Sequence, residues 1–327
     1  MHTEFWKRRI VFVTGASGLL GSTLVRVLVD SGAEVVALVR DSFPRSWLWS
    51  SGVGQRITCV HGSITDFTLL RRVIAEYGVE TVFHLAAQTL VDIAKLDPVG
   101  TLDTNIGGTW LLLEAARQSN VKQVVLASSD KAYGTSDNLP YREDHPLRGE
   151  YPYEVSKSCA DLIARMYYIT YGLPVSVARC VNLFGPGDLN FNRLIPGTIK
   201  AMLLRETLTI RSNGRSRREF LFVEDAASGY MCLAEEMSYD TRILGEAFNF
   251  GSGTCLEVLD VCSHIFNIGG CQEMKPQILN TSSTEIEEQS VDSSKARTTL
   301  NWSPAHTFEE GIRKSVRWYK EIWLPTA

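Results

Sequence analysis

The chain has 327 residues, 33 Lys and Arg against 37 Asp and Glu, a formal net charge of −4, and 44% hydrophobic residues. This length suits one large α/β domain with a smaller lobe, or about two domains, and the near-average composition argues against disordered and fibrous classes. Its slight acidity argues against general nucleic-acid binding, which requires a basic surface to neutralise phosphates.

The first half alternates short apolar runs with longer segments of helical period. The apolar runs predict strands at residues 10–14, 35–39, 57–60, 81–85, 121–127 and 175–180. The segments between them predict helices at 19–30, 68–77, 107–118 and 155–171. Strands that are apolar at nearly every position and separated by helices indicate a parallel sheet buried on both faces. We therefore predict an α/β fold of the Rossmann type, with a doubly wound parallel sheet.

The pattern loosens after about residue 183, where Gly185-Pro186-Gly187 interrupts the chain. Strand candidates at 208–211, 220–223 and 247–250 are mixed with helices, and the polar stretch 281–290 is predicted as a loop or lobe edge. We predict a dinucleotide-binding Rossmann domain at 1–182 and a smaller α/β C-terminal substrate lobe at 183–327, with a chain crossing allowed between the lobes.

A glycine-rich turn joins the first strand to the first long helix. Its glycines suit a tight turn, a close approach to a pyrophosphate and close packing of helix on strand, although such glycines also occur in ordinary turns. The strand before and the helix after favour a dinucleotide site. The cofactor contacts predicted in this turn are Gly15, Ser17, Gly18, Leu19, Leu20 and Gly21.

The choice between NAD and NADP stays open. NAD enzymes usually end the second strand with an acidic residue that binds the ribose 2′-OH, whereas here Val39 is followed by Arg40 and Asp41. Arg40 could pair with the 2′-phosphate of NADP, because a guanidinium matches phosphate geometry, or it could be a surface arginine.

A reactive pair is predicted at Tyr153 and Lys157. Residues four apart share one helix face, so the ammonium could lower the pKa of the phenol and hold a cofactor ribose. Such a pair is common and usually structural, but it follows the fifth strand, whose end carries Ser128, Ser129 and Asp130. Ligands of open α/β sheets bind at the carboxyl ends of strands.

These motifs resemble the extended short-chain dehydrogenase/reductase superfamily, in particular the NDP-sugar epimerases and dehydratases. The resemblance covers nearly the whole chain. Besides the glycine turn and the Tyr153/Lys157 pair, it rests on residues 84–87, Asn105, 128–129, 179–182, 185–187, 193–196, 218–225 and 245–251.

Asp130 and Lys131 discriminate between the reactions within this superfamily. At these two positions the epimerases usually have small or uncharged residues, whereas nucleotide-sugar 4,6-dehydratases have an acid and a base. Ser129-Asp130-Lys131 looks like the version found in CDP-glucose 4,6-dehydratase-like enzymes, whereas dTDP-glucose enzymes have Asp-Glu. The chain as a whole most resembles 4,6-dehydratases of the CDP-glucose or GDP-mannose type. The resemblance therefore implies a 4,6-dehydratase, a lyase that converts an NDP-hexose to its 4-keto-6-deoxy sugar.

The implied catalytic roles follow from that reaction. Tyr153 would take the O4 proton, Ser129 would hydrogen-bond O4, and Lys157 would hold the ribose. A neutral Lys131 would remove the C5 proton, and a protonated Asp130 would give a proton to the departing C6 oxygen. The alternative is an NDP-sugar 4-epimerase of the UDP-glucose or UDP-glucuronate type, in which Asp130 and Lys131 form only an ion pair. A UDP-uronic acid decarboxylase and a cofactor-binding regulatory protein are further alternatives.

The resemblance also implies the ligands and their contacts. A tightly bound NADP or NAD, recycled within the reaction, would be contacted by Arg40, Ser63, Ile64, Leu85, Ala86, Ala87 and Asn105 as well as by the glycine turn, Tyr153 and Lys157. Ser63 stands where the superfamily often has an acidic residue. The nucleotide-sugar substrate would be contacted by Gln88, Ser129, Asn182, Arg193, Leu194 and Arg218. A homodimer through the Tyr153 helix and the helix at 107–118 is implied too.

Cysteines and apolar runs bear on location and metals. The seven cysteines include no C-x-x-C pair, which predicts neither a disulfide framework nor a thiolate zinc site and suits a reducing compartment. Residues 1–9 have no signal-peptide core, and no apolar run is long enough to span a bilayer. We expect a cytoplasmic protein with no metal, no membrane and no nucleic-acid partner.

Overall fold

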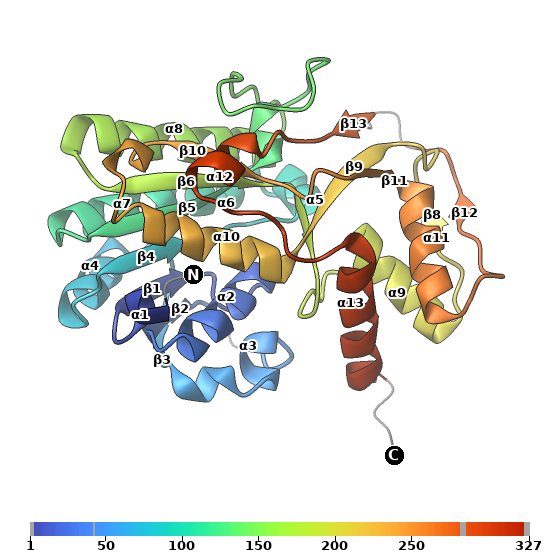
Figure 1. Ribbon diagram of the computed structural model, residues 1–327, viewed down its shortest axis with the longest axis horizontal. Coiled ribbons are helices and arrows are strands. Elements are labelled where there is room, and N and C mark those ends of the chain that lie inside the picture. Colours follow the sequence, from blue (N-terminus) through green and yellow to red (C-terminus); the bar gives the residue numbers. More distant parts are fainter. Residues whose placement is uncertain (1–2, 42, 282–285, 324–327) are drawn as a thin grey trace.

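Seven parallel strands form the central sheet of the computed structural model, which describes residues 3–41, 43–281 and 286–323 (Figure 1). The strands, in their order across the sheet, are β10 (Ala247–Phe250), β6 (Val175–Cys180), β5 (Gln123–Ser129), β4 (Thr81–His84), β1 (Ile10–Thr14), β2 (Glu34–Val39) and β3 (Thr58–His61). The predicted Rossmann-type fold is confirmed. The winding direction reverses between β1 and β4, the switch point at which such sheets bind their ligands.

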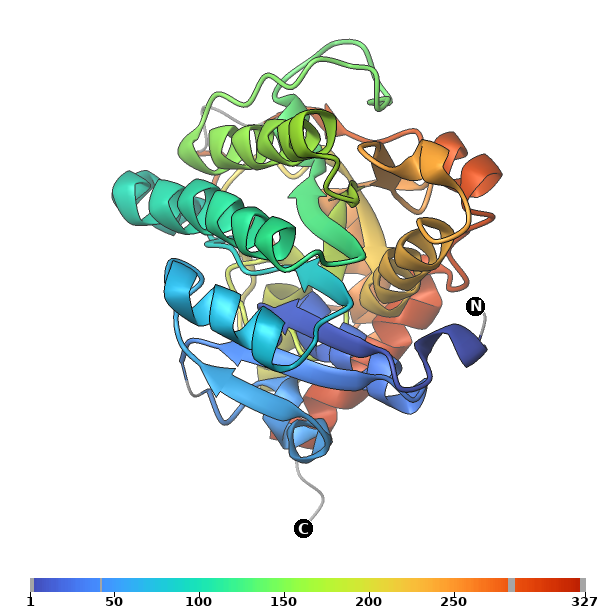
Figure 2. The same cartoon turned by 90° about the vertical axis from the view of Figure 1, so that its left-hand side faces the viewer.

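Helices cover both faces of this sheet (Figure 2). One face carries α4 (Phe67–Glu76), α7 (Gly108–Gln118) and α8 (Pro152–Tyr171), and the other carries α2 (Leu19–Asp30) and α10 (Val223–Glu236). In β1, Val11 and Val13 pack on the α2 and α10 side, whereas Phe12 packs on the other side. This alternation follows from the period of two in a strand, and burial on both faces explains why every position of β1 before Thr14 is apolar.

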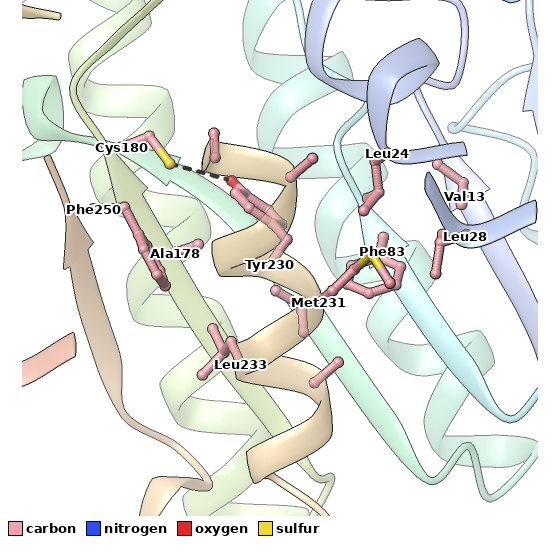
Figure 3. Close-up of a cluster of buried hydrophobic side chains, with 14 of the residues drawn as sticks. Val13, Leu24, Leu28, Phe83, Ala178, Cys180, Tyr230, Met231, Leu233 and Phe250 are labelled. Carbon is pink, nitrogen blue, oxygen red and sulfur yellow. Dashed lines mark hydrogen bonds between the residues drawn. The ribbon is translucent and has the colours of Figure 1, made fainter. Parts of the chain in front are cut away.

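Helix α10 ties the second half of the chain to the sheet. Figure 3 shows Tyr230 and Met231 of α10 between the strands and α2, with the Tyr230 hydroxyl 3.9 Å from Cys180 Sγ. Both α10 and β10 follow residue 182 in the sequence, yet both belong to the sheet layers. The chain therefore crosses between the lobes, and the division at residue 182 stays a prediction.

The second lobe is built on a small sheet and three helices. In the sheet, β9 (Arg217–Phe222) pairs with β7 (Asn182–Phe184), β11 (Cys255–Glu257) and β13 (Glu288–Gln289). The helices α9 (Leu194–Leu204), α11 (Val258–Gly269) and α13 (Phe308–Trp323) enclose a core that includes Phe184, Ile199 and Ile265. A separate pair joins β8 (Thr209–Ile210) to β12 (Gln277–Ile278).

Several predicted bounds differ from those observed. Strand β5 runs two residues beyond its expected end, so Ser128 and Ser129 lie in the strand. Helix α8 begins at Pro152, three residues early, because a proline opens it and Glu154 accepts from the backbone of its cap residue, Tyr151. Residues 103–107 form a π-helical turn ahead of α7. Within 281–290, Glu288–Gln289 form an edge strand, and 282–285 lie outside the described residues.

The remaining elements are short. They are α1 (Thr3–Trp6), α3 (Trp47–Ser50), α5 (Val91–Leu96), α6 (Pro98–Leu102) and α12 (Ser294–Thr299), with single turns at Val53–Arg56, Asp130–Tyr133 and Thr241–Ile243. Among the described residues, no helix has the length and apolar character that crossing a membrane requires.

Candidate active site

The glycine turn packs against the end of the neighbouring strand. Gly15 has a φ of +72°, and a Cβ there would lie 2.7 Å from the Ala86 backbone nitrogen. At Gly21 a Cβ would lie 2.1 Å from the Gly15 carbonyl oxygen. Neither position therefore admits a side chain. By contrast, a Cβ on Gly18 would have a single neighbour, 3.4 Å away, so Gly18 faces open space.

That open side fits a dinucleotide pyrophosphate. Gly18 is the N-cap of α2 and provides no side-chain cap, and the first N–H groups of any helix lack intrahelical acceptors. Ser17 is half-buried, and Leu19 and Leu20 pack against the core of the second lobe. The start of α2 thus lies where the two lobes meet.

His84 fixes the end of β4 beside this turn. Its Nδ1 lies 2.8 Å from Thr14 Oγ1, and its Nε2 lies 3.1 Å from Thr109 Oγ1. Burial, with the charge of Lys157, lowers the pKa of His84 to about 3, so the ring is neutral. The Leu85 and Ala86 amides donate to the same Thr14 hydroxyl, each at 3.2 Å. Leu85, Ala86 and Ala87 therefore follow a strand end that is fixed to the glycine turn.

The residues predicted at the adenosine end lie at the ends of β2 and β3. Arg40 follows β2 and is 70% exposed, and its Nε donates to Asp41 at 2.6 Å. Ser63 pairs with Thr65, while Ile64 is buried against Gly108. No carboxylate stands directly at the end of β2, because Val39 occupies that position.

Asn105 lies in the π-helical turn and joins two segments of the site. Its Nδ2 donates to the Gln88 carbonyl (3.0 Å) and to Ser156 Oγ (2.9 Å), and its Oδ1 accepts from the Gln88 amide (2.7 Å). Ser156 is fully buried between Tyr153 and Lys157 on α8. Asn105 therefore holds the Gln88 loop against the reactive helix, and Ser156 is a member of the site that the sequence interpretation missed.

Tyr153 and Lys157 are both buried on the first two turns of α8. Burial, helped by the negative charge of Asp130, raises the pKa of Tyr153 to about 12, against the lowering effects of Arg193 and of a hydrogen bond with Ser129. Burial lowers the pKa of Lys157 to about 8. Lys157 Nζ donates to the Ala127 carbonyl at 2.9 Å and lies 6.0 Å from the Tyr153 ring centroid. We expected the Lys157 ammonium to lower the pKa of Tyr153, but in the free chain burial outweighs any such effect and the pKa is raised.

Ser129, Asp130 and Lys131 form a compact acid and base cluster. Ser129 ends β5, and its Oγ donates to Asp130 Oδ1 at 2.9 Å and accepts from the Lys131 amide at 3.3 Å. Asp130 is fully buried, and its Oδ2 has no hydrogen-bond partner among the described residues. Lys131 Nζ lies 3.5 Å from Asp130 Oδ1, and its side chain is 24% exposed. The pair is therefore not a solvated surface contact.

Four of the predicted substrate residues come from three segments of the second lobe, whereas Gln88 and Ser129 follow or end strands of the central sheet. Asn182, at the start of β7, contacts Lys131 Nζ at 3.1 Å. Arg193, the N-cap of α9 before Leu194, donates to buried Asp188 at 3.0 Å. Arg218, on β9, donates to the Arg217 carbonyl at 2.8 Å.

Of these residues, Arg193 lies within electrostatic reach of Tyr153. Positive charge on Arg193 lowers the pKa of Tyr153, and that on Arg218 lowers the pKa of Tyr141, both of which burial raises to about 12. Asp188 and the buried Glu219 were missed from the sequence. A carboxylate directly before the apolar residues 220–222 of β9 is the signal that could have found Glu219.

Comparison with known proteins shows similarity along nearly the whole chain. The family described as GDP-mannose 4,6 dehydratase matches residues 12–315. A CDP-glucose 4,6-dehydratase of Salmonella typhimurium is 32% identical over 98% of this chain and 93% of its own. A solved dTDP-glucose 4,6-dehydratase of Streptomyces venezuelae with NAD bound is 30% identical, with a TM-score of 0.87 over 95% of this chain and 97% of its own. A solved epimerase of Methanothermobacter thermautotrophicus is 29% identical, with a TM-score of 0.90 over 98% of this chain and 95% of its own.

Proposed function

The chain belongs to the GDP-mannose 4,6-dehydratase family, and on that premise we propose that it is an NAD(P)-dependent nucleotide-sugar 4,6-dehydratase. The reaction converts an NDP-hexose to its 4-keto-6-deoxy sugar by oxidation at C4, loss of water across C5 and C6, and reduction at C6. When bound, NAD(P) would supply the hydride-transfer chemistry at C4 and C6. The glycine turn, the end of β4 and Lys157 would hold it.

The observation that carries this proposal is the acid and base cluster beside Ser129. A C4 ketone acidifies the C5 proton, so elimination of water requires a base for C5 and an acid for the C6 oxygen. Lys131 would supply the base and Asp130 the acid, and both lie within a single helical turn. Asp130 Oδ2, the oxygen without a partner, is the atom that would deliver the proton. A 4-epimerase needs neither group, because it only turns its substrate between two hydride transfers.

Tyr153 and its neighbours would serve the oxidation at C4. Tyr153 would take the O4 proton, with Ser129 hydrogen-bonding the same oxygen. Because burial raises the pKa of Tyr153, proton removal requires positive charge nearby, and Arg193 supplies some of it in the free chain. Lys157, fixed by the Ala127 carbonyl, would hold the cofactor ribose.

The substrate lobe suits a nucleotide diphosphate. Arg193 and Arg218 carry permanent positive charges, Arg193 near enough to Tyr153 to lower its pKa, and guanidinium groups match phosphate oxygens. Leu194 and Gln88 would complete the surroundings of the sugar nucleotide.

Two further features are proposed from the surface and the cysteines. Apolar side chains of α7 and α8 lie exposed at Trp110, Leu162, Met166 and Ile169, which suits a homodimer through these two helices. All seven cysteines are free, as expected in the reducing cytoplasm.

The function is tested with a panel of CDP-glucose, dTDP-glucose, UDP-glucose and GDP-mannose, with products identified by NMR. Lys131→Met and Asp130→Asn should each abolish formation of the 4-keto-6-deoxy sugar, because general acid and base groups contribute roughly 10²- to 10⁴-fold. The matched control is Lys122→Met, an exposed lysine paired with Glu80, which should retain wild-type turnover. Near wild-type dehydration by both site variants would overturn the assignment, and C4 inversion by the wild type would show an epimerase.

The cofactor is identified by denaturing the purified protein and measuring the mass of what it releases. If this is NADP, Arg40→Ala should weaken NADP binding and leave NAD binding unchanged. Equal weakening of both would place Arg40 outside the 2′-phosphate site.

A further inference from the structure

We propose that Asn182 is a positioning residue for Lys131, holding the amine so that its lone pair is free to take the C5 proton. This inference rests on the proposed function, because it assigns a partner to the base of the elimination. It also gives Asn182 a role other than contact with the substrate diphosphate.

Hydrogen bonds fix the orientation of the Asn182 amide. One end of the amide lies 3.1 Å from the Glu219 backbone carbonyl, which can only accept, so this end must be Nδ2. The other end, Oδ1, therefore faces Lys131 Nζ, also at 3.1 Å. Both ends of the side chain are engaged within the protein, and the amide presents an acceptor to the lysine.

The support behind Asn182 is rigid. Strand β7 pairs with β9, with Asn182 opposite Phe220. The Glu219 side chain is buried and accepts from the Gly253 amide at 2.6 Å and the Val291 amide at 2.9 Å. Glu219 therefore orients Asn182 through its backbone carbonyl while its own side chain is fixed by two amides. Through Asn182, the second lobe thus supports Lys131.

The two acceptors around Lys131 match the needs of a neutral amine. A neutral amine has two N–H bonds and one lone pair. Asn182 Oδ1 at 3.1 Å and Asp130 Oδ1 at 3.5 Å account for two N–H bonds. In the proposed elimination Asp130 is the protonated acid, so neither acceptor carries a charge and the lone pair is left for the substrate. A carboxylate in place of the amide would instead favour the ammonium, which cannot accept a proton.

The elimination balances with these groups. The C5–H bond breaks and its proton goes to Lys131 Nζ, while the electron pair forms the C5=C6 bond. The C6–O bond breaks, and the oxygen takes a proton from Asp130 and leaves as water. Lys131 returns its proton to C5 as C6 is reduced, and the proton taken by Tyr153 from O4 offsets the one that Asp130 has given.

The test compares Asn182→Ala and Asn182→Asp with Asn267→Ala, an exposed asparagine on α11, as the matched control. The substrate is whichever of the four panel compounds the wild type dehydrates, and the readouts are KM, kcat and deuterium uptake at C5 in heavy water. For Asn182→Ala we expect C5 exchange and kcat to fall by roughly 10- to 100-fold with KM within about twofold, because misplacing a reacting group by an ångström costs about that much. Asn182→Asp, nearly isosteric, should move the pH dependence of kcat to higher pH, because a carboxylate beside a base favours the protonated form of that base.

Other outcomes overturn the inference. A raised KM with unchanged C5 exchange in bound substrate would make Asn182 a diphosphate ligand, and a pH profile of Asn182→Asp parallel to the wild type would exclude control of Lys131. Failure of the proposed function is distinguishable, because Lys131→Met would then retain C5 exchange, or the wild type would dehydrate none of the four compounds.

Discussion

The cofactor side and the substrate side of the site use the chain in different ways. On the cofactor side, consecutive residues from Thr14 to Gly21 form the turn. Its shape depends on close backbone contacts that only glycines, which lack side chains, permit. On the substrate side, Lys131 after β5 contacts Asn182 of β7, which the Glu219 carbonyl of β9 orients, and these contacts form only because the second lobe folds against the sheet. The first is fixed by local sequence and close packing, whereas the second depends on contacts between distant segments. Substitutions on the cofactor side should therefore disturb backbone packing, whereas substitutions on the substrate side should change side-chain chemistry.

Gly21→Ala is expected to have the largest effect. Its Cβ would lie 2.1 Å from the Gly15 carbonyl, so the turn cannot keep its shape, and both cofactor binding and stability should be lost. Gly18→Ala is the matched variant, because its Cβ meets only one atom at 3.4 Å. It should fold normally and still bind NAD(P)H poorly, as measured by cofactor fluorescence and thermal unfolding. Equal behaviour of the two variants would contradict the geometry of the turn.

Lys157 should give an intermediate effect that depends on pH. Burial lowers its pKa from 10.5 to about 8, so between these values the unfolded chain binds more protons than the folded one. The free energy of unfolding should therefore rise by up to about 3 kcal/mol from pH 8 to 10.5 and fall as the pH returns to 8. Denaturant titrations of the wild type and Lys157→Met measure this, and the difference between them isolates Lys157. Parallel profiles would show that its pKa is not lowered.

Glu219→Gln should give the smallest effect and tests the substrate side. The buried carboxylate accepts from the Gly253 and Val291 amides, and a glutamine would direct an NH2 group at one of them. Leaving one buried donor without a partner costs about 1–3 kcal/mol. We expect a modest loss of stability with cofactor binding intact. Weakened NAD(P)H binding would mean that the two sides are not independent.

The elements of the proposed cofactor side could be predicted from the sequence for a physical reason. Strand β1, the glycine turn and α2 are contiguous, and their periods of two and 3.6 are visible in the order of residues. The positions of Tyr153 and Lys157 on one helix follow from the same periodicity. For Ser129, Asp130 and Lys131, adjacency in the chain alone places the three side chains together, and their roles in the reaction stay a proposal.

The substrate side could be predicted only in part. The contact between Lys131 and Asn182 spans 51 residues and depends on the pairing of β7 with β9. Strand β7 has only three residues, too few to show a strand period in the sequence. Asn105 and Ser156 meet across a similar separation, through a π-helical turn that no periodicity predicts. Burial of Glu219 likewise results from loops that close over β9 from residues 251–253 and 291.

Wild-type turnover in heavy water tests the central claim, that Asp130 and Lys131 make this protein a dehydratase, most directly. The protein is incubated with the four-compound panel, and the products are examined by NMR. We predict that one compound yields a 4-keto-6-deoxy sugar that carries solvent deuterium at C5. A hexose inverted at C4 with hydrogen retained at C5 would contradict the account.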